Sequence, residues 1–134
     1  MDYSVYLIGP HLIGVLFIVI GLVQYYLPPK KINRWYGYRT PTARSSQQAW
    51  DEGNRYSALY MMRAGFVVLI LGFFVYAGMI YFNVEADILK WISYLILFGG
   101  AMGIGILSTV ATEKHLRTKF KLPAVKRPPL KTRK

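Results

Sequence analysis

Three apolar segments alternate with polar ones along this chain of 134 residues. They extend over residues 5–27, 64–82 and 91–112, and none of them contains Asp, Glu, Lys or Arg. A soluble domain would repeat its apolar positions at a period of about 2 or 3.6 residues. A run of about 20 apolar residues is instead long enough to cross a bilayer as a helix. The pattern therefore predicts an all-α integral membrane protein with three transmembrane helices.

The edges of these segments carry residues that end or anchor helices. Pro28 and Pro29 end the first segment, because proline cannot donate the backbone hydrogen bond that continues a helix. The chain has no basic residue before Lys30 and no small-residue cleavage site after the first segment, so we expect that segment to remain in the mature protein. Residues 83–90 form a short connection, which predicts an antiparallel hairpin of the second and third helices.

Lysine and arginine are distributed unevenly among the polar segments. Seven lie in residues 28–63 and nine in residues 113–134, whereas residues 83–90 contain only Lys90. Because Lys and Arg are retained on the cytoplasmic side, we expect a multi-pass protein of the cytoplasmic membrane with its N-terminus outside. The loop 28–63 and the C-terminus then lie inside. This asymmetry accounts for the net charge of +11, and we expect no nucleic-acid partner because no nucleic-acid-binding module is recognisable.

The chain accordingly divides into a transmembrane domain, residues 1–112, and a basic cytoplasmic tail, residues 113–134. We expect the tail to contact anionic lipid headgroups, which contribute about 1 kcal/mol for each basic residue near the surface.

The loop 28–63 holds most of the side chains that could recognise a partner. Its first half predicts a fixed turn, since Gly37 can adopt a positive φ and the residue before Pro41 should be extended. Its second half predicts a short interfacial helix. The run Ser45–Gln48 has the pattern of a capping box with Ser45 as N-cap, so the helix should extend from Ser46 to about Ser57. The sequence leaves open whether this helix continues into the second span.

Six residues of this loop form a spaced pattern: Asn33, Gly37, Arg39, Thr40, Trp50 and Asn54. The pattern resembles the signature of the SdpI family of bacterial membrane proteins, an N…G-x-R-T…W…N element on a cytoplasmic loop between apolar spans. The resemblance covers most of the chain up to about Thr112 and implies that these six residues form a partner-binding motif. It also implies a place in the bacterial inner membrane. The family's namesake gives immunity to a secreted, membrane-active peptide toxin and signals by holding a transcriptional regulator at the membrane. The namesake is longer, so this chain resembles a short, three-span member.

Several of these side chains allow two interpretations. Arg39 is suited to bind a carboxylate or a lipid phosphate, but it could also tether the loop to headgroups. Trp50 could line a binding groove, although a residue of the aromatic belt at the membrane surface is the favoured interpretation. Asn54, beside it on one helix face, should make a specific hydrogen bond. Glu113 could pair with an arginine of the loop and so attach the loop to the third helix, or it could be an exposed carboxylate at headgroup level.

The glycines of the third segment predict a close helix contact. Gly99 and Gly103 form a GxxxG pattern, which lets another helix approach closely. The partner could be a second copy in a homo-oligomer, but we favour one of the chain's own helices.

The residue types that are missing limit the chemistry. The chain has no cysteine, no Gly-rich phosphate loop and no metalloprotease motif, and its three spans contain no Asp, Glu, Lys or Arg. His11 and His115 lie on opposite sides of the expected membrane, so they cannot share a metal. We therefore expect no enzyme, no cofactor and no metal. Two alternatives remain. One is a lipid-headgroup-binding membrane enzyme that would use Asp51, Glu52, Glu113 or His115 as its base. The other is a small structural subunit of a membrane complex.

Overall fold

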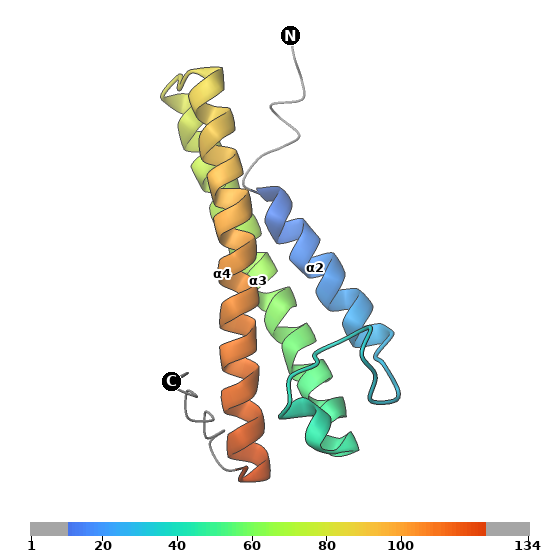
Figure 1. The fold of residues 1–134 in the computed structure, drawn as a ribbon. Helices are drawn as coiled ribbons and strands as arrows, with labels where there is room; N and C mark the ends of the chain where they lie inside the picture. Colours follow the sequence, from blue (N-terminus) through green and yellow to red (C-terminus); the bar gives the residue numbers. More distant parts are fainter. Residues whose placement is uncertain (1–10, 123–134) are drawn as a thin grey trace, which may run out of the picture.

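The computed structural model describes residues 11–122 and is all-α over that range (Figure 1). The elements, in chain order, are α2 (His11–Tyr26), the 3-10 turn η1 (Ala43–Ser45), α3 (Gln47–Tyr81) and α4 (Ala86–Phe120). The two long helices, α3 and α4, have 35 residues each and lie side by side in opposite directions. The expected helical hairpin is thus confirmed. The shorter helix α2 leans against α3, and the loop after α2 wraps around the first turns of α3 (Figure 1).

Helix α3 is continuous from the polar loop into the second apolar segment, which answers the question that the sequence left open. The expected interfacial helix forms its first turns. The N-cap, however, is Ser46, whose side chain accepts a hydrogen bond from the backbone N–H of Ala49 at 3.1 Å. The predicted N-cap, Ser45, was wrong by one residue because its hydroxyl is used in the preceding turn, where it donates to Thr42 O at 2.7 Å.

Helix α4 begins before the predicted span 91–112 and ends eight residues after it, at Phe120. Its C-cap is Lys121, which has a left-handed backbone. At 1.5 Å per residue, a helix of this length is about 50 Å long, whereas the hydrocarbon core of a bilayer is about 30 Å thick. The last turns of α4 therefore extend beyond the length that an apolar span requires.

Both long helices are apolar enough to cross a membrane, and few residues in their most apolar windows are buried within the described chain, 11% in α3 and 17% in α4. Large side chains such as Phe74 and Leu95 are about three-quarters exposed. Such continuous exposed apolar surface suits a lipid environment and suggests a membrane location. Helix α2 is also apolar but has 16 residues. The start of the first predicted span and most of the predicted tail lie outside the described residues.

The close helix contact lies between α2 and α3, not on the glycines that the sequence suggested. A Cβ atom on Gly14 would come within 2.6 Å of Gly65 O, and one on Gly21 within 2.8 Å of Ala58 O. Apart from its chain neighbours and the adjoining backbone of α4, no atom of the described chain lies within 4 Å of a Cβ built on Gly99 or Gly103. The favoured expectation that these two glycines pack against a helix of the same chain was therefore wrong for the described helices. The GxxxG pattern permits a close approach but does not select the partner.

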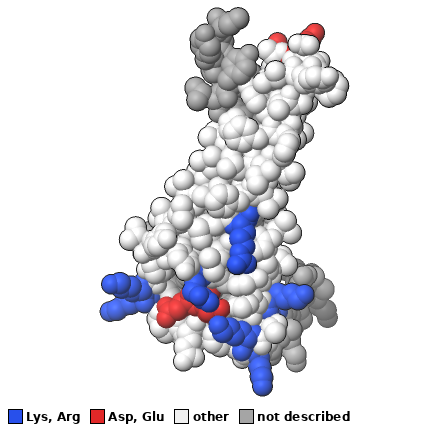
Figure 2. Space-filling model, turned by 180° about the vertical axis from the view of Figure 1, so that it is seen from behind, with Lys and Arg blue, Asp and Glu red and all other residues white. Residues whose placement is uncertain are grey.

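Charged side chains are concentrated at the two ends of the molecule. Figure 2 shows a long section without charge between acidic side chains at one tip and a group of Lys and Arg at the other end. In the described chain, every Lys and Arg other than Lys90 lies in residues 30–63 or 114–121.

Candidate functional site

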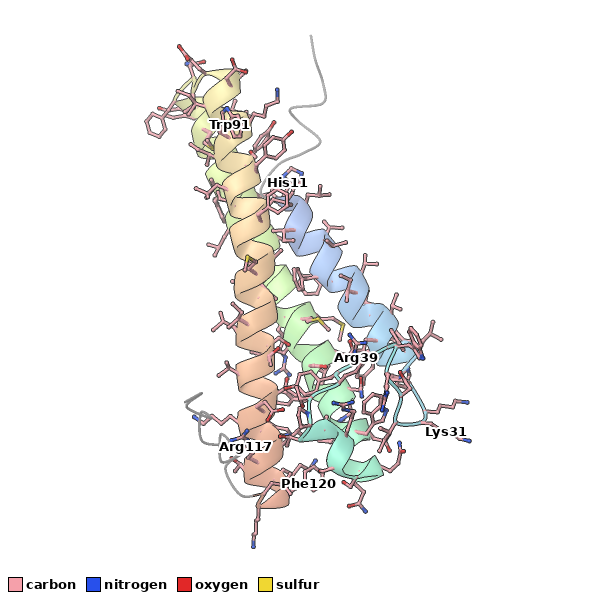
Figure 3. All side chains as sticks on the ribbon, viewed as in Figure 1. His11, Lys31, Arg39, Trp91, Arg117 and Phe120 are labelled. Carbon is pink, nitrogen blue, oxygen red and sulfur yellow. The ribbon has the colours of Figure 1, made fainter. Side chains whose placement is uncertain are left out.

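The loop between α2 and α3 is held against the first turns of α3 and the last turns of α4 (Figure 3). Asn54, on α3, is the centre of this arrangement and is 1% exposed. Its Oδ1 accepts a hydrogen bond from the backbone N–H of Tyr38 at 2.6 Å, and its Nδ2 donates to Trp50 O at 2.8 Å. The amide thus binds the loop to the helix, as the sequence led us to expect for Asn54. A buried amide that meets both its donor and its acceptor needs fixes the geometry around it.

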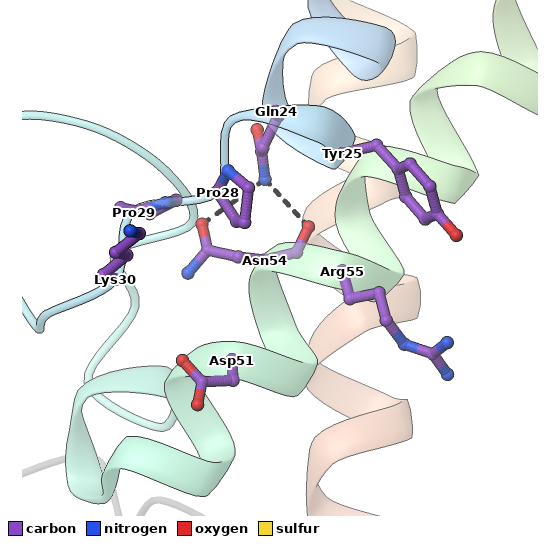
Figure 4. A pocket seen from close by; sticks show the side chains of 8 residues that line it. All are labelled: Gln24, Tyr25, Pro28, Pro29, Lys30, Asp51, Asn54 and Arg55. Atoms are coloured by element: carbon purple, nitrogen blue, oxygen red, sulfur yellow. Dashed lines mark hydrogen bonds between the residues drawn. The ribbon is translucent and has the colours of Figure 1, made fainter.

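Gln24 completes this network from the last turn of α2. Its Nε2 donates to Ser57 Oγ at 2.7 Å and to Asn54 O at 3.0 Å, with a longer contact of 3.4 Å to Asn54 Oδ1. Figure 4 shows the two bonds between Gln24 and Asn54 as dashed lines. Gln24 is 7% exposed, so its buried bonds link the end of α2 to α3, and the bond from Tyr38 to Asn54 adds the loop to this network.

Position 37 requires glycine because of its backbone conformation and because there is no room for a side chain. Its φ is +94°, and a Cβ at this position would collide with Asn54 Oδ1 and lie 2.7 Å from Pro29 Cγ. Trp50 occupies the other side of the same region. It is fully buried, and its indole N–H donates to Pro29 O at 2.8 Å. The favoured interpretation of Trp50 as a residue of the aromatic belt was wrong, because the ring is buried inside the described chain and its N–H is bonded to the loop.

The other motif residues lie in the outer part of the loop, where they form local turns or are exposed. Asn33 Oδ1 accepts from the backbone N–H groups of Trp35 and Tyr36, each at 2.9 Å, which closes a local turn. Arg39 is exposed and donates from Nη1 to Arg34 O at 2.6 Å. Trp35, on the turn made by Asn33, is 91% exposed. Thr40 Oγ1 accepts from Ala43 N at 3.3 Å and so begins the turn into η1.

Glu113 attaches the loop to α4. Its carboxylate accepts hydrogen bonds from Tyr38 OH at 3.2 Å and Thr42 Oγ1 at 2.7 Å, and Arg117 Nη2 lies at 3.3 Å. Partial burial raises the pKa of Glu113, but hydrogen bonds from the loop and the charge of Arg117 outweigh it and hold the pKa below its usual value. Burial, together with the negative charge of Glu113, raises the pKa of Tyr38 far above its usual value, so Tyr38 remains a donor. Glu113 therefore does lock the loop to α4, but through hydroxyl groups and not through a loop arginine.

Glu52 forms a second connection between α3 and α4. Its Oε1 lies 2.8 Å from His115 Nε2 and 2.9 Å from Lys119 Nζ, and its Oε2 lies 3.8 Å from Arg55 Nε. The His115 ring also stacks on Tyr56, with centroids 4.1 Å apart. Burial opposes ionisation, but the hydrogen bonds from His115 and Lys119 and nearby positive charge lower the pKa of Glu52. Leu116, on the same turns of α4, is fully buried against α3 near Gly53.

Comparison with known proteins places this site in a family. The model of the SdpI/YfhL protein family matches residues 30–112, which include all but the first residues of the loop, the whole of α3 and α4 up to Thr112. This chain belongs to the SdpI/YfhL protein family. It is also similar to the uncharacterized protein YfhL of Bacillus subtilis (strain 168), with 46% identity over 59 residues. Those residues are 44% of this chain and 54% of YfhL, so the chain spans about half the length of that curated relative. No solved structure matches the chain.

In this member of the SdpI/YfhL family, the predicted motif residues separate into two groups. Gly37, Trp50 and Asn54 converge on one buried network, whereas Asn33, Arg39 and Thr40 lie in the outer loop. Sequence reasoning missed Gln24, Tyr38 and Thr42, which join the loop to the helices, and it gave Trp35 no particular role. A polar residue inside an otherwise apolar run, Gln24, was the one signal that could have found a member of this set.

Proposed function

We propose that this protein is a bacterial inner-membrane protein that acts by recognition and protects the cell against a membrane-active peptide. Membership of the SdpI/YfhL family supports this proposal, as do the two helices long and apolar enough to span a bilayer. A cytoplasmic regulator held at the same loop is a further partner that the proposal accommodates.

In the proposed topology α2, α3 and α4 belong to three membrane-spanning segments. The loop and the end of α4 lie on the cytoplasmic side, and the turn at residues 82–85 lies outside. The distribution of positive charge supports this orientation, because Lys and Arg cluster at the loop end while Lys90 stands alone near the turn. Because the chain has no cysteine, single substitutions Arg44→Cys and Ala86→Cys provide a direct test. A membrane-impermeant thiol reagent added to intact cells should label the second and not the first, and the reverse result would refute the orientation.

The observation that carries the proposal is the rigid attachment of the loop, which leaves Arg39 and Trp35 exposed. Asn54 and Glu113 bind the loop at its base, and Gln24 joins Asn54 to α2, so the outer part of the loop is presented in one conformation. Recognition by a preorganised loop avoids the entropy cost of ordering the loop on binding. An exposed tryptophan and an exposed arginine are the residue types that most often dominate protein interfaces.

The engagement of the acidic side chains favours recognition over turnover. Glu52 joins α3 to α4 through His115 and Lys119, Glu113 joins the loop to α4, and Asp51 accepts from Gln47 Nε2 at 2.7 Å. His115 is stacked on Tyr56 and bonded to Glu52. Each of these groups thus already has a structural partner in this region, and none of them is assigned the role of a general base.

The test is complementation of a deletion strain challenged with membrane-active peptides. We expect Arg39→Ala, Trp50→Ala and Asn54→Ala to insert in the membrane but to lose protection. Trp35→Ala should behave in the same way if the exposed ring contacts the partner. Arg44→Ala, an exposed basic residue of the same loop that makes no side-chain contact in the motif network, is the matched control and should protect fully. Full protection by the Arg39 and Asn54 variants would refute the proposal that the loop is the active element.

A further inference from the structure

A pocket opens where the last turn of α2 and the start of the loop meet α3 (Figure 4). Its volume is about 550 Å³, within the range of about 300–1,000 Å³ that is usual for sites that hold small ligands. The buried amides of Gln24 and Asn54 form its floor. This floor is rigid, because both amides are tied into the network that holds the loop.

The rim of the pocket carries charges of both signs. Lys30 and Asp51 lie to one side of the floor and Arg55 to the other (Figure 4). Asp51 and Arg55 are one turn apart on α3, which places their Cβ atoms about 5–6 Å apart on one helix face. Their charged groups have other neighbours. Arg55 Nε lies 3.8 Å from Glu52 Oε2, and the Arg55 side chain is 62% exposed. Asp51 accepts a hydrogen bond from Gln47. Since a carboxylate can accept several hydrogen bonds, Asp51 has capacity for another donor.

These charges match a ligand that is itself a zwitterion. A phosphate group accepts strong, charge-assisted hydrogen bonds from guanidinium and ammonium groups, as Arg55 and Lys30 provide. A primary ammonium group has three N–H donors, one of which could bind the carboxylate of Asp51. We propose that this pocket binds the phosphoethanolamine headgroup of phosphatidylethanolamine. A choline headgroup lacks the N–H donors, and a glycerol headgroup lacks the positive charge.

The walls of the pocket favour a lipid over a free phosphate ester. Pro28 and the ring of Tyr25 give the pocket mostly apolar walls. Beside them, α2 and its C-terminal end expose Leu22, Tyr26 and Leu27, so acyl chains could leave the pocket along this face. The pocket lies at the end of the apolar stretch of α2, where the proposed topology places the headgroups of the inner leaflet. The inference rests on that membrane placement and does not depend on protection against a peptide.

The experiment is titration of the full chain, purified in a non-ionic detergent, with short-chain lipids followed by native mass spectrometry. The probes are dihexanoyl-phosphatidylethanolamine, the corresponding phosphatidylcholine and phosphatidylglycerol, and free O-phosphoethanolamine. We expect the ethanolamine lipid to bind about tenfold more tightly than the other two lipids, the effect of one charge-assisted hydrogen bond. Free O-phosphoethanolamine should compete only weakly, since it lacks the apolar part.

Variants of the rim separate the two halves of the headgroup. Asp51→Asn should abolish the preference for ethanolamine over glycerol, and Arg55→Gln should weaken the binding of all three lipids. Lys31→Gln, an exposed neighbour of Lys30 outside the pocket, is the matched control and should bind like the unmodified protein. Equal affinity for the three lipids, or an ethanolamine preference that survives Asp51→Asn, would overturn the inference. Free O-phosphoethanolamine that competes as well as the lipid would also overturn it, in favour of a site for a soluble phosphate ester.

The lipid site and the proposed function can fail separately. An Asp51→Asn variant that loses the preference for the ethanolamine lipid but still protects cells supports the lipid inference and shows that protection does not require it. An unmodified protein that selects the ethanolamine lipid but gives no protection overturns the proposed function alone.

Discussion

The backbone N–H of Tyr38 donates to the side-chain oxygen of Asn54 at 2.6 Å, across 16 residues of sequence. The residue before Tyr38 is Gly37, whose positive φ turns the chain so that this N–H faces the helix. The side chain of Tyr38 reaches α4, where its hydroxyl donates to Glu113. One short segment of the loop therefore connects α3 with α4, and the Asn54 amide is what bonds it to α3.

Replacement of Asn54 by alanine should detach this segment. The N–H of Tyr38 would lose its acceptor, and a buried polar group without a partner costs about 1–3 kcal/mol. Gln24 would lose only its longer contact of 3.4 Å, because its other acceptors are Ser57 Oγ and the backbone oxygen of residue 54. We expect Asn54→Ala to lower the free energy of unfolding by about 2 kcal/mol, measured by chemical unfolding in detergent. Gln48→Ala, an exposed site on the same helix, should change it by less than about 0.5 kcal/mol. Equal stability of the two variants would mean that the amide does not hold the loop.

Alanine at Gly37 should be as disruptive for a different reason. A non-glycine residue at φ +94° is strained, at a cost of about 1 kcal/mol or more, and the new methyl group would collide with Asn54. We expect Gly37→Ala to lower stability and to make the loop more sensitive to limited proteolysis. Gly78→Ala is the matched control. It lies in α3 with open space around it, so alanine there should leave stability unchanged or raise it slightly. Proteolysis of Gly37→Ala at the rate of the unmodified protein would contradict this explanation.

The broad plan of the molecule could be predicted from the apolar pattern. Uncharged runs placed the apolar parts of α3 and α4, and Pro28 and Pro29 marked the end of α2 closely, because helix length and proline stereochemistry are local properties. A hydrogen-bonding role for Asn54 could also be predicted, since an amide beside Trp50 on one helix face usually has a specific partner. The partner itself could not be predicted, because it lies on a loop whose path depends on Gly37.

The errors arose where tertiary contacts choose between equivalent residues. Ser45 and Ser46 are both good N-caps, and the docking of the turn at Thr42 onto Glu113 decides which of them faces the helix. From the sequence, Gln24 was interpreted as a residue at the end of a span. In the structure it donates to Ser57, 33 residues away, because α2 and α3 cross there. For the same reason, sequence spacing could not show that Trp50 is buried with its indole N–H bonded to Pro29 O.

The crossing of α2 and α3 should not tolerate a methyl group at its closest point. A Cβ on Gly14 would lie 2.5 Å from Leu69 N and 2.6 Å from Gly65 O, both backbone atoms that cannot move aside without shifting a helix. We expect Gly14→Ala to lower the unfolding temperature by several degrees, since overpacking costs about 1–3 kcal/mol. Gly99→Ala adds the same methyl group to an open face of α4 and should have no such effect. If Gly99→Ala were the destabilising variant, the contact would lie on α4, as the sequence alone suggested.

Acid should weaken the attachment of the loop to α4. The pKa of Glu113 is held below the ordinary value of about 4.3. A carboxylate whose pKa is lower in the folded state stabilises that state when both states are ionised, so the contribution is present at neutral pH. It is lost as the pH falls below about 4.3 and through the folded pKa. Free energies of unfolding measured between roughly pH 3 and 7 should therefore fall on the acid side.

Two variants isolate the part of this acid dependence that belongs to Glu113. Glu113→Gln should reduce the acid-side slope but not remove it, because the pKa of Glu52 is also lowered and Glu52 titrates in the same direction. Thr42→Val keeps the carboxylate but removes its 2.7 Å donor, so it should reduce the slope less. Lys114→Gln, an exposed neighbour on α4, should follow the curve of the unmodified protein. A Glu113→Gln variant that retained the full slope would show that the carboxylate does not couple the loop to α4. The attachment would then depend on the packing of Leu116 and Tyr38 around Gly53.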